Sequence, residues 1–191
     1  MSAQVTKAAG APVTGLTAEQ LHAIMPLAGA RADIFAPILA DVMLFRQINT
    51  PARAAAFLAQ VGHESGQLRY LREIWGPTPA QLKYEGREDL GNTQPGDGKR
   101  FLGRGLIQIT GRSNYAVCGA ALGVDLLAQP ELLEKPQYAA GSAAWFWLQH
   151  NLNRFADRGD FVGLTKAING GTNGITDRRA LWERAKTALQ A

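Results

Sequence analysis

Two glutamates nine residues apart, Glu64 and Glu73, are the side chains whose type and spacing best suit catalysis. Glu64 ends an apolar pattern of helical period over residues 51–64 and lies on the apolar face of that pattern. This face is formed by Ala54, Phe57, Leu58 and Val61. Burial disfavours the ionised form of a carboxyl, so a Glu on this face could keep its proton and act as a general acid. The alternative is a Glu that turns into solvent, because Gly62 and Gly66 weaken the last helical turn.

Glu73 is the candidate for the general base. Arg69 and Arg72 precede it closely in the sequence, and their charges would keep its carboxyl ionised. One acid that protonates the leaving oxygen and one base that activates water are the pair used in glycoside hydrolysis. Glu73 could instead be a solvated surface partner of the two arginines. Glu85, which follows Tyr84 in a long loop, is the reserve candidate for the base.

Neither a metal site nor a cofactor is expected. His63 precedes Glu64 but has no second His at helical spacing, and His22 and His150 lie in unrelated sequence contexts. Cys118 is the single cysteine, so an intrachain disulfide cannot form. The chain must therefore be stable without a covalent cross-link or a bound ion.

The charge pattern argues against nucleic acid as the partner. The formal charge is +4, but the lysines and arginines are scattered and no recognised nucleic-acid motif is present. A modest positive charge also suits an acidic polymer such as a bacterial cell wall. The sequence contains no apolar run of about 18 residues, so we expect no stable membrane insertion. The first residues contain no apolar core typical of a secretory signal, which predicts synthesis in the cytoplasm.

The elements that must position the candidate residues are mostly helices. We expect a flexible tail over residues 1–16 and a single catalytic domain over residues 17–191. The loop over residues 76–105, rich in Gly, Pro, Asn and Asp, is long enough to be functional and could hold a short helix over 79–84. Helices are predicted from the capping box at Thr17, around 35–42 with Pro37 in the first turn, over 51–64, 113–122 and 137–149, and from caps at Asp160 and Thr176.

One short strand is predicted at Leu106–Thr110. A period of two places Ile107 and Ile109 on one face, and Gln108 with Thr110 on the other. A polar pair on a strand whose other face is buried could line a cleft. The alternative is a half-exposed edge strand with its polar side chains in water.

Four stretches of the chain carry a family resemblance in the expected order. They are Phe57-Leu58-Ala59-Gln60 running into His63-Glu64-Ser65-Gly66, the stretch from Gly103 to Tyr115, the stretch from Leu126 to Trp147, and Ile168-Asn169-Gly170-Gly171. Together they resemble glycoside hydrolase family 19 over roughly residues 17 to 188. The resemblance implies a mainly α, lysozyme-like fold, with two lobes around a sugar-binding groove and a small β element lining the cleft. It also implies an inverting mechanism, which places the two carboxyls about 6.5–9.5 Å apart.

The resemblance also assigns roles to single residues. Glu64 matches the family's general acid, Glu73 matches the second catalytic acid, and Thr110 occupies the position that holds the attacking water. Arg178 matches the Arg that engages the catalytic carboxyls, which agrees with its place on the inward stripe of the last helix, where a charge needs a partner. The positions expected to contact substrate are Gln108, Asn114, Asn169, Arg178, Tyr84 and Glu85.

Two departures from the family pattern favour one of its branches. The single cysteine and the missing signal are unlike the secreted chitinases, and the stretch around Tyr84-Glu85-Gly86-Arg87 resembles the compact endolysins of phages and prophages. This resemblance implies a monomeric muramidase that cleaves the β-1,4 bond between N-acetylmuramic acid and N-acetylglucosamine in peptidoglycan. Such an enzyme would reach the wall after release through a holin.

The sequence leaves three alternatives open. A chitinase would use the same residues on N-acetylglucosamine polymers. A non-catalytic wall-binding or membrane-disrupting protein would use the cationic, amphipathic last helix over residues 177–189 instead. A toxin delivered into competing bacteria would share the catalytic site and differ only in its delivery.

Overall fold

The computed structural model describes residues 15–191, and within this range the chain forms ten α-helices and two short 3₁₀ turns. Most of the expected tail, residues 1–14, lies outside the described residues. Leu16 belongs to the core, so the packed domain begins slightly earlier than expected. The helices are α1 Ala18–Ile24, α2 Arg31–Phe45, α3 Pro51–Glu64, α4 Pro79–Leu82, α5 Asp97–Arg100, α6 Arg112–Leu122, α7 Pro136–Gln149, α8 Asn153–Asp157, α9 Phe161–Asn169 and α10 Ile175–Leu189. The 3₁₀ turns span Glu88–Leu90 and Pro130–Glu134.

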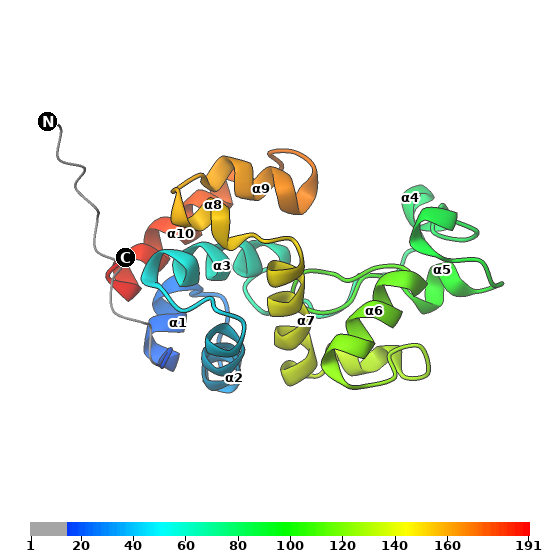
Figure 1. Ribbon diagram of the computed structural model, residues 1–191, viewed down its shortest axis with the longest axis horizontal. Coiled ribbons are helices and arrows are strands. Elements are labelled where there is room, and N and C mark those ends of the chain that lie inside the picture. The colour runs from blue at the N-terminus through cyan, green and yellow to red at the C-terminus, as the bar shows by residue number, and fades with distance from the viewer. Residues whose placement is uncertain (1–14) are drawn as a thin grey trace, which may run out of the picture.

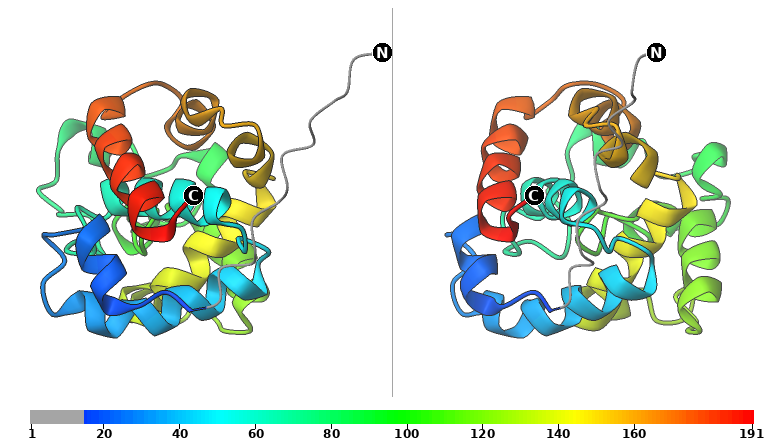
Figure 2. Two further views of the ribbon diagram at one scale, coloured as in Figure 1. Left: turned by 90° about the vertical axis from the view of Figure 1, so that its left-hand side faces the viewer. Right: turned by 60° about the vertical axis from the view of Figure 1, so that its left-hand side comes forward.

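The larger lobe is built around α3, which is buried from Ala54 to Gly62. Thr50 caps this helix and Pro51 occupies its first position, as the sequence predicts. Gly62 lets α10 approach closely, because a Cβ there would lie 3.3 Å from Leu181. In both views of Figure 2, α10 (red) lies beside α3 (cyan), with α1 and α2 below them.

The smaller lobe has a hydrophobic core of its own, and α7 joins the two cores. Trp147 on α7 meets Phe57 of α3 edge to face in the larger lobe, whereas Trp145 packs into the smaller one. A helix that is apolar on all sides is typically buried on all sides, and α7 is buried between the lobes in this way (Figure 1). The two-lobed helical fold is therefore confirmed. The core of the smaller lobe comprises Phe101, Ile109, Tyr115, Cys118, Leu126, Leu133 and Trp145.

The prediction of a strand at Leu106–Thr110 is wrong. Gly105 and Gln108 both have positive φ, and the chain reverses between Arg104 and Ile109, whose backbones exchange hydrogen bonds of 3.1 and 2.7 Å. Ile107 and Ile109 are buried while Gln108 and Thr110 are half-buried, so the alternation of burial is present without a strand. Alternation alone cannot distinguish a strand from a tight turn on a core. Within residues 15–191 the β structure is limited to isolated bridges.

Two helix starts also differ from expectation. Helix α2 begins at Arg31, so Pro37 lies in its second turn on the exposed face, where water can bind the carbonyl that Pro leaves free. Helix α10 begins after Gly174 rather than at a Thr176 cap, because Gly174 takes the positive φ that closes the preceding turn. The caps at Thr17 and Asp160 are confirmed. No helix in residues 15–191 is long and apolar enough to cross a membrane.

Candidate active site

Glu64 is the last residue of α3, and the turn that follows it is well ordered by hydrogen bonds. The Ser65 backbone N–H donates to Val61 O at 3.0 Å, and the Ser65 hydroxyl donates to the same carbonyl at 2.7 Å. The Ser65 hydroxyl also accepts from the Leu68 N–H at 2.8 Å. Ser65 is fully buried. The helix end is therefore closed rather than frayed, and the Glu64 side chain is only 20% exposed.

Arg178 holds the Glu64 carboxyl from the opposite helix. Its Nη2 donates to Glu64 Oε1 at 2.5 Å, its Nη1 donates to Gln60 Oε1, and its Nε donates to Asn173 O at 3.2 Å. Gln60 is fully buried and donates in turn to Thr165 Oγ1 at 3.0 Å. Arg178 is thus fixed by three acceptors. Within the described chain, Glu64 Oε2 makes no hydrogen bond.

The apolar pattern alone suggested purely apolar surroundings for Glu64, whereas the resemblance predicted a contact with Arg178, and that contact is present. The inward face of α3 does carry this carboxyl, but a buried guanidinium meets it there. A neighbouring cation favours the charged form of a carboxyl, whereas apolar burial disfavours it. Glu64 therefore has a charged partner on one side of its carboxyl, and one of its two oxygens remains free of that partner.

Glu73 is held by three neutral donors. The Gly103 N–H donates to its Oε2 at 3.1 Å, and Gln81 Nε2 and the Tyr84 hydroxyl donate to its Oε1 at 2.9 and 3.4 Å. Burial, together with the charge of Glu73, raises the pKa of the Tyr84 phenol above its usual value, so this hydroxyl remains a donor. The expected partners, Arg69 and Arg72, are elsewhere. Arg69 donates to Gly66 O, and Arg72 lies 3.9 Å from Glu134.

The backbone at Gly103 approaches Glu73 as closely as a glycine allows. A Cβ at this position would lie 2.8 Å from Gln108 Oε1 and 3.3 Å from Glu73 Oε2. Any side chain here would displace one of these two groups. The glycine is therefore needed for the contact that orients the Glu73 carboxylate.

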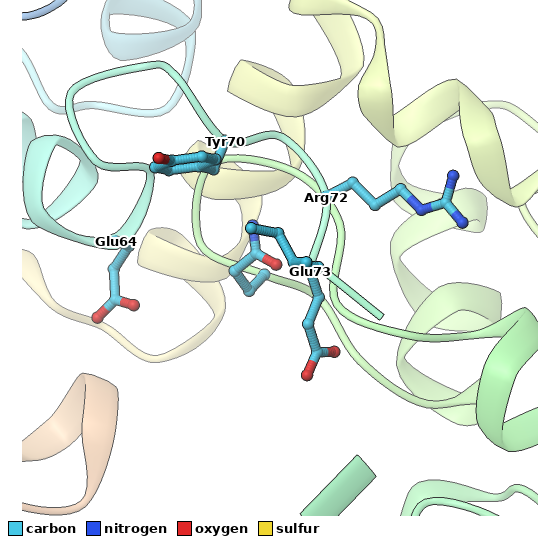
Figure 3. Close-up of a pocket in the computed structure, with 6 residues that line it drawn as sticks. Glu64, Tyr70, Arg72 and Glu73 are labelled. Atoms are coloured by element: carbon cyan, nitrogen blue, oxygen red, sulfur yellow. The ribbon is translucent and has the colours of Figure 1, made fainter. Parts of the chain in front are cut away.

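A pocket of about 260 Å³ lies between the two carboxyls. The carboxyl groups of Glu64 and Glu73 come from opposite sides and point into the same space, whereas Arg72 points away from both (Figure 3). Glu64 belongs to the end of α3, and Glu73 to the segment that crosses towards the smaller lobe. The pocket is lined by Glu64, Tyr70, Arg72, Glu73, Ile74 and Gln108.

The residues expected on the strand now lie on the turn and on α6. The Gln108 side chain lines the pocket and donates to Gly105 O at 3.0 Å. The Thr110 hydroxyl donates to Gln108 O at 3.0 Å, and Asn114 Nδ2 donates to Thr110 O at 2.7 Å. These contacts hold Thr110 and Asn114 next to the pocket-lining Gln108.

The carboxylate of Glu85 is not free but stabilises a loop through hydrogen bonds. Its Oε1 accepts from the Gly96 N–H at 2.6 Å and its Oε2 from the Gly98 N–H at 2.8 Å. Both oxygens thus tie together the loop of the smaller lobe, and Glu85 does not line the pocket. Tyr84 precedes it and does reach the site, through its contact with Glu73.

Asn169 shapes a turn on the side of α10. Its Oδ1 accepts from the Gly171 N–H at 2.8 Å, and its Nδ2 donates to Asn173 O at 3.1 Å, the carbonyl that also binds Arg178. Beside this turn, His63 Nδ1 lies 2.6 Å from Asp177 Oδ2. Consecutive residues of α3 thus meet consecutive residues of α10, because His63 pairs with Asp177 and Glu64 with Arg178.

Sequence reasoning missed four residues that the structure brings to the site, one of which is Gln81, the donor to Glu73. Tyr70 and Ile74 line the pocket and are largely exposed, and buried Gln60 positions Arg178. Tyr70 and Ile74 lie close in the sequence to the two candidate acids. An aromatic and an apolar residue at such positions could have been predicted to line the pocket. Within the described chain, no cluster of three or more His, Cys, Asp or Glu side chains could hold a metal ion.

A two-lobed helical protein with two carboxyls facing one pocket has the arrangement found in glycoside hydrolases. Residues 47–163 match the family described as "Chitinase class I", which is glycoside hydrolase family 19. The chain belongs to this family.

Individual relatives agree with this assignment. A glycosyl hydrolase family 19 domain-containing protein of Haemophilus influenzae is 34% identical over 156 residues, which cover 67% of this chain and 76% of the relative. An endochitinase of Arabidopsis thaliana is 42% identical over 118 residues, which cover 61% of this chain. The chain spans only 38% of the length of that plant protein.

Solved structures share the fold over nearly the whole chain. Chitinase C from Streptomyces griseus superposes with a TM-score of 0.73 at 25% identity, covering 94% of this chain and 78% of that one. A class IV family 19 chitinase from Zea mays superposes with a TM-score of 0.68 at 25% identity, covering 90% of both chains. The helical architecture is therefore that of family 19 chitinases.

Proposed function

We propose that this protein hydrolyses β-1,4 glycosidic bonds in polymers that contain N-acetylglucosamine. The observation that carries the proposal is the pair of carboxyls, Glu64 and Glu73, that face one pocket from opposite sides (Figure 3). Relatives named as chitinases support chitin as a substrate. Peptidoglycan, the first expectation from the sequence, remains the second candidate, because its glycan also contains N-acetylglucosamine and the protein is cationic.

The geometry supports direct displacement by water. Glu64 gives a proton to the leaving sugar oxygen, from the Oε2 that Arg178 does not hold. Glu73 takes a proton from the attacking water, and the Gly103 N–H with Gln81 keeps its carboxylate oriented towards the pocket. Thr110 donates its own proton to Gln108 O, so its hydroxyl oxygen can accept a hydrogen bond from that water. Attack opposite the leaving group inverts the anomeric carbon.

The test compares Glu64→Gln and Glu73→Gln with Glu88→Gln, an exposed carboxyl outside the pocket, on chitin oligomers and purified peptidoglycan. The first two variants should lose at least about 10³-fold in kcat, because each removes a proton transfer. The Glu88 variant should match the wild type. Mass spectrometry of the fragments would identify the cleaved bond, and NMR would show the α anomer first if the reaction inverts. Near-normal hydrolysis by the Glu64 variant would disprove the proposal.

The non-catalytic alternative makes the opposite prediction, since wall binding or membrane disruption would survive loss of Glu64. Helix α10 packs on α3 and α1 within the larger lobe, so its apolar face is already buried by the protein itself. This packing disfavours a membrane role for α10. A monomeric state, cytoplasmic synthesis, and access to the wall through a holin remain part of the proposal for the peptidoglycan substrate.

A further inference from the structure

We propose that Arg72 forms a subsite for a carboxylate carried by the glycan, and so favours an anionic polymer over neutral chitin. The inference rests on the proposed hydrolysis and adds a substrate preference to it. Arg72 lines the pocket next to Glu73, and its side chain is 49% exposed. A guanidinium on the wall of a sugar-binding pocket can donate hydrogen bonds to neutral sugar oxygens, but it binds a carboxylate more strongly.

Arg72 shares its carboxylate partner, Glu134, with a second arginine. Arg104 Nε lies 2.7 Å from Glu134 Oε1, whereas Arg72 Nε lies 3.9 Å from the same oxygen. Arg104 is nearly buried and also donates to Arg100 O and to the Tyr115 hydroxyl. A buried guanidinium needs its counter-charge more than an exposed one does. One carboxylate therefore serves two arginines, and Arg72 makes the longer and more exposed of the two contacts, which leaves its guanidinium able to bind a second carboxylate.

The backbone places this charge beside the catalytic centre. Arg72 forms an antiparallel bridge with Arg104, and the Glu73 N–H donates to Gly103 O at 2.8 Å, so the segment is fixed on both sides. Successive residues of an extended chain point in opposite directions. Figure 3 shows Arg72 directed away from the carboxyl of Glu73. A group bound by Arg72 would thus be a substituent of the glycan rather than the bond that is cleaved.

The chemistry of the two candidate polymers differs at this point. Chitin carries only hydroxyl and acetamido groups. Peptidoglycan carries a lactyl ether on every second sugar, which ends in a carboxylate or continues into a stem peptide with carboxylates of its own. A guanidinium binds a carboxylate through two parallel hydrogen bonds, and an exposed one does so in a salt-dependent way. Arg72 is suited to either carboxylate.

The experiment separates binding from cleavage by using the Glu64→Gln protein as the background. Binding is measured for Arg72→Gln, for Arg72→Lys and for the control Arg184→Gln, an exposed charge on α10. Three ligands are compared: a chitin oligomer, glycan strands with stem peptides, and glycan strands from which an amidase has removed the peptides. Arg72→Gln should weaken binding of an anionic glycan roughly tenfold more than binding of the chitin oligomer. The difference should shrink at high salt, and Arg72→Lys should recover part of it.

Each outcome has a separate meaning. A loss confined to strands with peptides assigns the carboxylate to the stem, and a loss confined to stripped strands assigns it to the lactyl group; both support the subsite. Equal losses on charged and neutral ligands, or the same effect in the Arg184 control, overturn it. Cleavage by the protein with Glu64 intact is measured in parallel on the same ligands. Absence of cleavage would refute the proposed function, whatever Arg72 does to binding.

Discussion

Arg178 and Glu64 form the contact that joins α10 to the C-terminal end of α3, with 2.5 Å between Nη2 and Oε1. The guanidinium is 2% exposed and the carboxyl 20%. Gln60, one turn earlier on α3, accepts from the same guanidinium, so the position of Arg178 is determined by the helix that carries the acid. The larger lobe therefore presents Glu64 to the pocket in one orientation.

Removal of this contact should affect both activity and stability. Arg178→Ala leaves Gln60 and Glu64 without their donor, which should lower kcat at least about 100-fold and the free energy of unfolding by about 3–5 kcal/mol. Arg178→Lys keeps the charge but cannot reach all three acceptors. Its kcat and its free energy of unfolding should therefore lie between those of the wild type and those of Arg178→Ala. Urea unfolding and kinetics on chitin oligomers measure the effects. A normal kcat in the Ala variant would mean that the contact does not position the acid.

A methyl group at Gly103 should disturb the base without unfolding the protein. The Cβ would lie 2.8 Å from Gln108 Oε1 and 3.3 Å from Glu73 Oε2, the ends of flexible side chains that can move away, and 3.3 Å from Gln108 Cβ, which a small shift can relieve. We expect Gly103→Ala to keep its circular dichroism spectrum and to lose roughly tenfold in kcat, since a displaced base transfers protons less well. An unchanged kcat would show that Glu73 does not depend on this close approach.

The ion pair between Asp97 and Arg112 predicts a loss of stability in acid. Arg112 Nε and Nη2 lie 2.7 and 2.6 Å from the nearly buried Asp97 carboxylate, and these bonds hold the pKa of Asp97 below its usual 3.8. A carboxyl with a lowered folded-state pKa stabilises the fold above its unfolded-state pKa and loses this contribution as the pH falls.

Asp97→Asn tests this pH dependence. At pH 7 the variant should be less stable by about 3 kcal/mol, because it leaves Arg112 without its counter-charge. The difference between wild type and variant should begin to shrink below about pH 3.8, where the Asp97 carboxyl of the unfolded chain gains a proton, and should be lost as the pH falls through the lower pKa of the folded protein. Urea unfolding at both pH values measures it. A difference that stays constant with pH would contradict the ion-pair explanation.

Cys118 should be unreactive in the folded protein. It is buried in the core of the smaller lobe, and burial raises the pKa of its thiol to about 12. Since the thiolate is the reactive form, alkylation by iodoacetamide at pH 8 should be slow in native protein and fast in urea. Mass spectrometry follows the modification. Fast labelling without denaturant would indicate that the smaller lobe opens readily.

The sequence was sufficient to predict most helices, and it singled out Glu64 and Glu73, which line one pocket in the structure. Helix caps and apolar faces depend on residues within about four positions of each other. Such short-range patterns can be recognised without knowledge of the fold, as they were for the caps at Thr17, Thr50 and Asp160 and for the apolar face before Glu64. The stretch around Glu64 and the stretch from Gly103 to Tyr115, with two further matches in the same order, were sufficient to indicate the family. The prediction of a strand at 106–110 was wrong because a tight turn can give the same alternation of buried and half-buried side chains as a strand.

Only the tertiary structure decided which charged groups meet. Glu73 lies one residue from Arg72 in the sequence, yet the structure gives it Gln81, Tyr84 and Gly103 as partners. Arg178 reaches Glu64 across 114 positions. The local amino-acid sequence determines helices through short-range hydrogen bonds and side-chain periodicity. The partners of buried charges depend instead on how whole helices pack. The sequence by itself therefore determined the family and the candidate acids, and the packing of α3, α10 and the 104–109 turn decided how the pocket is built.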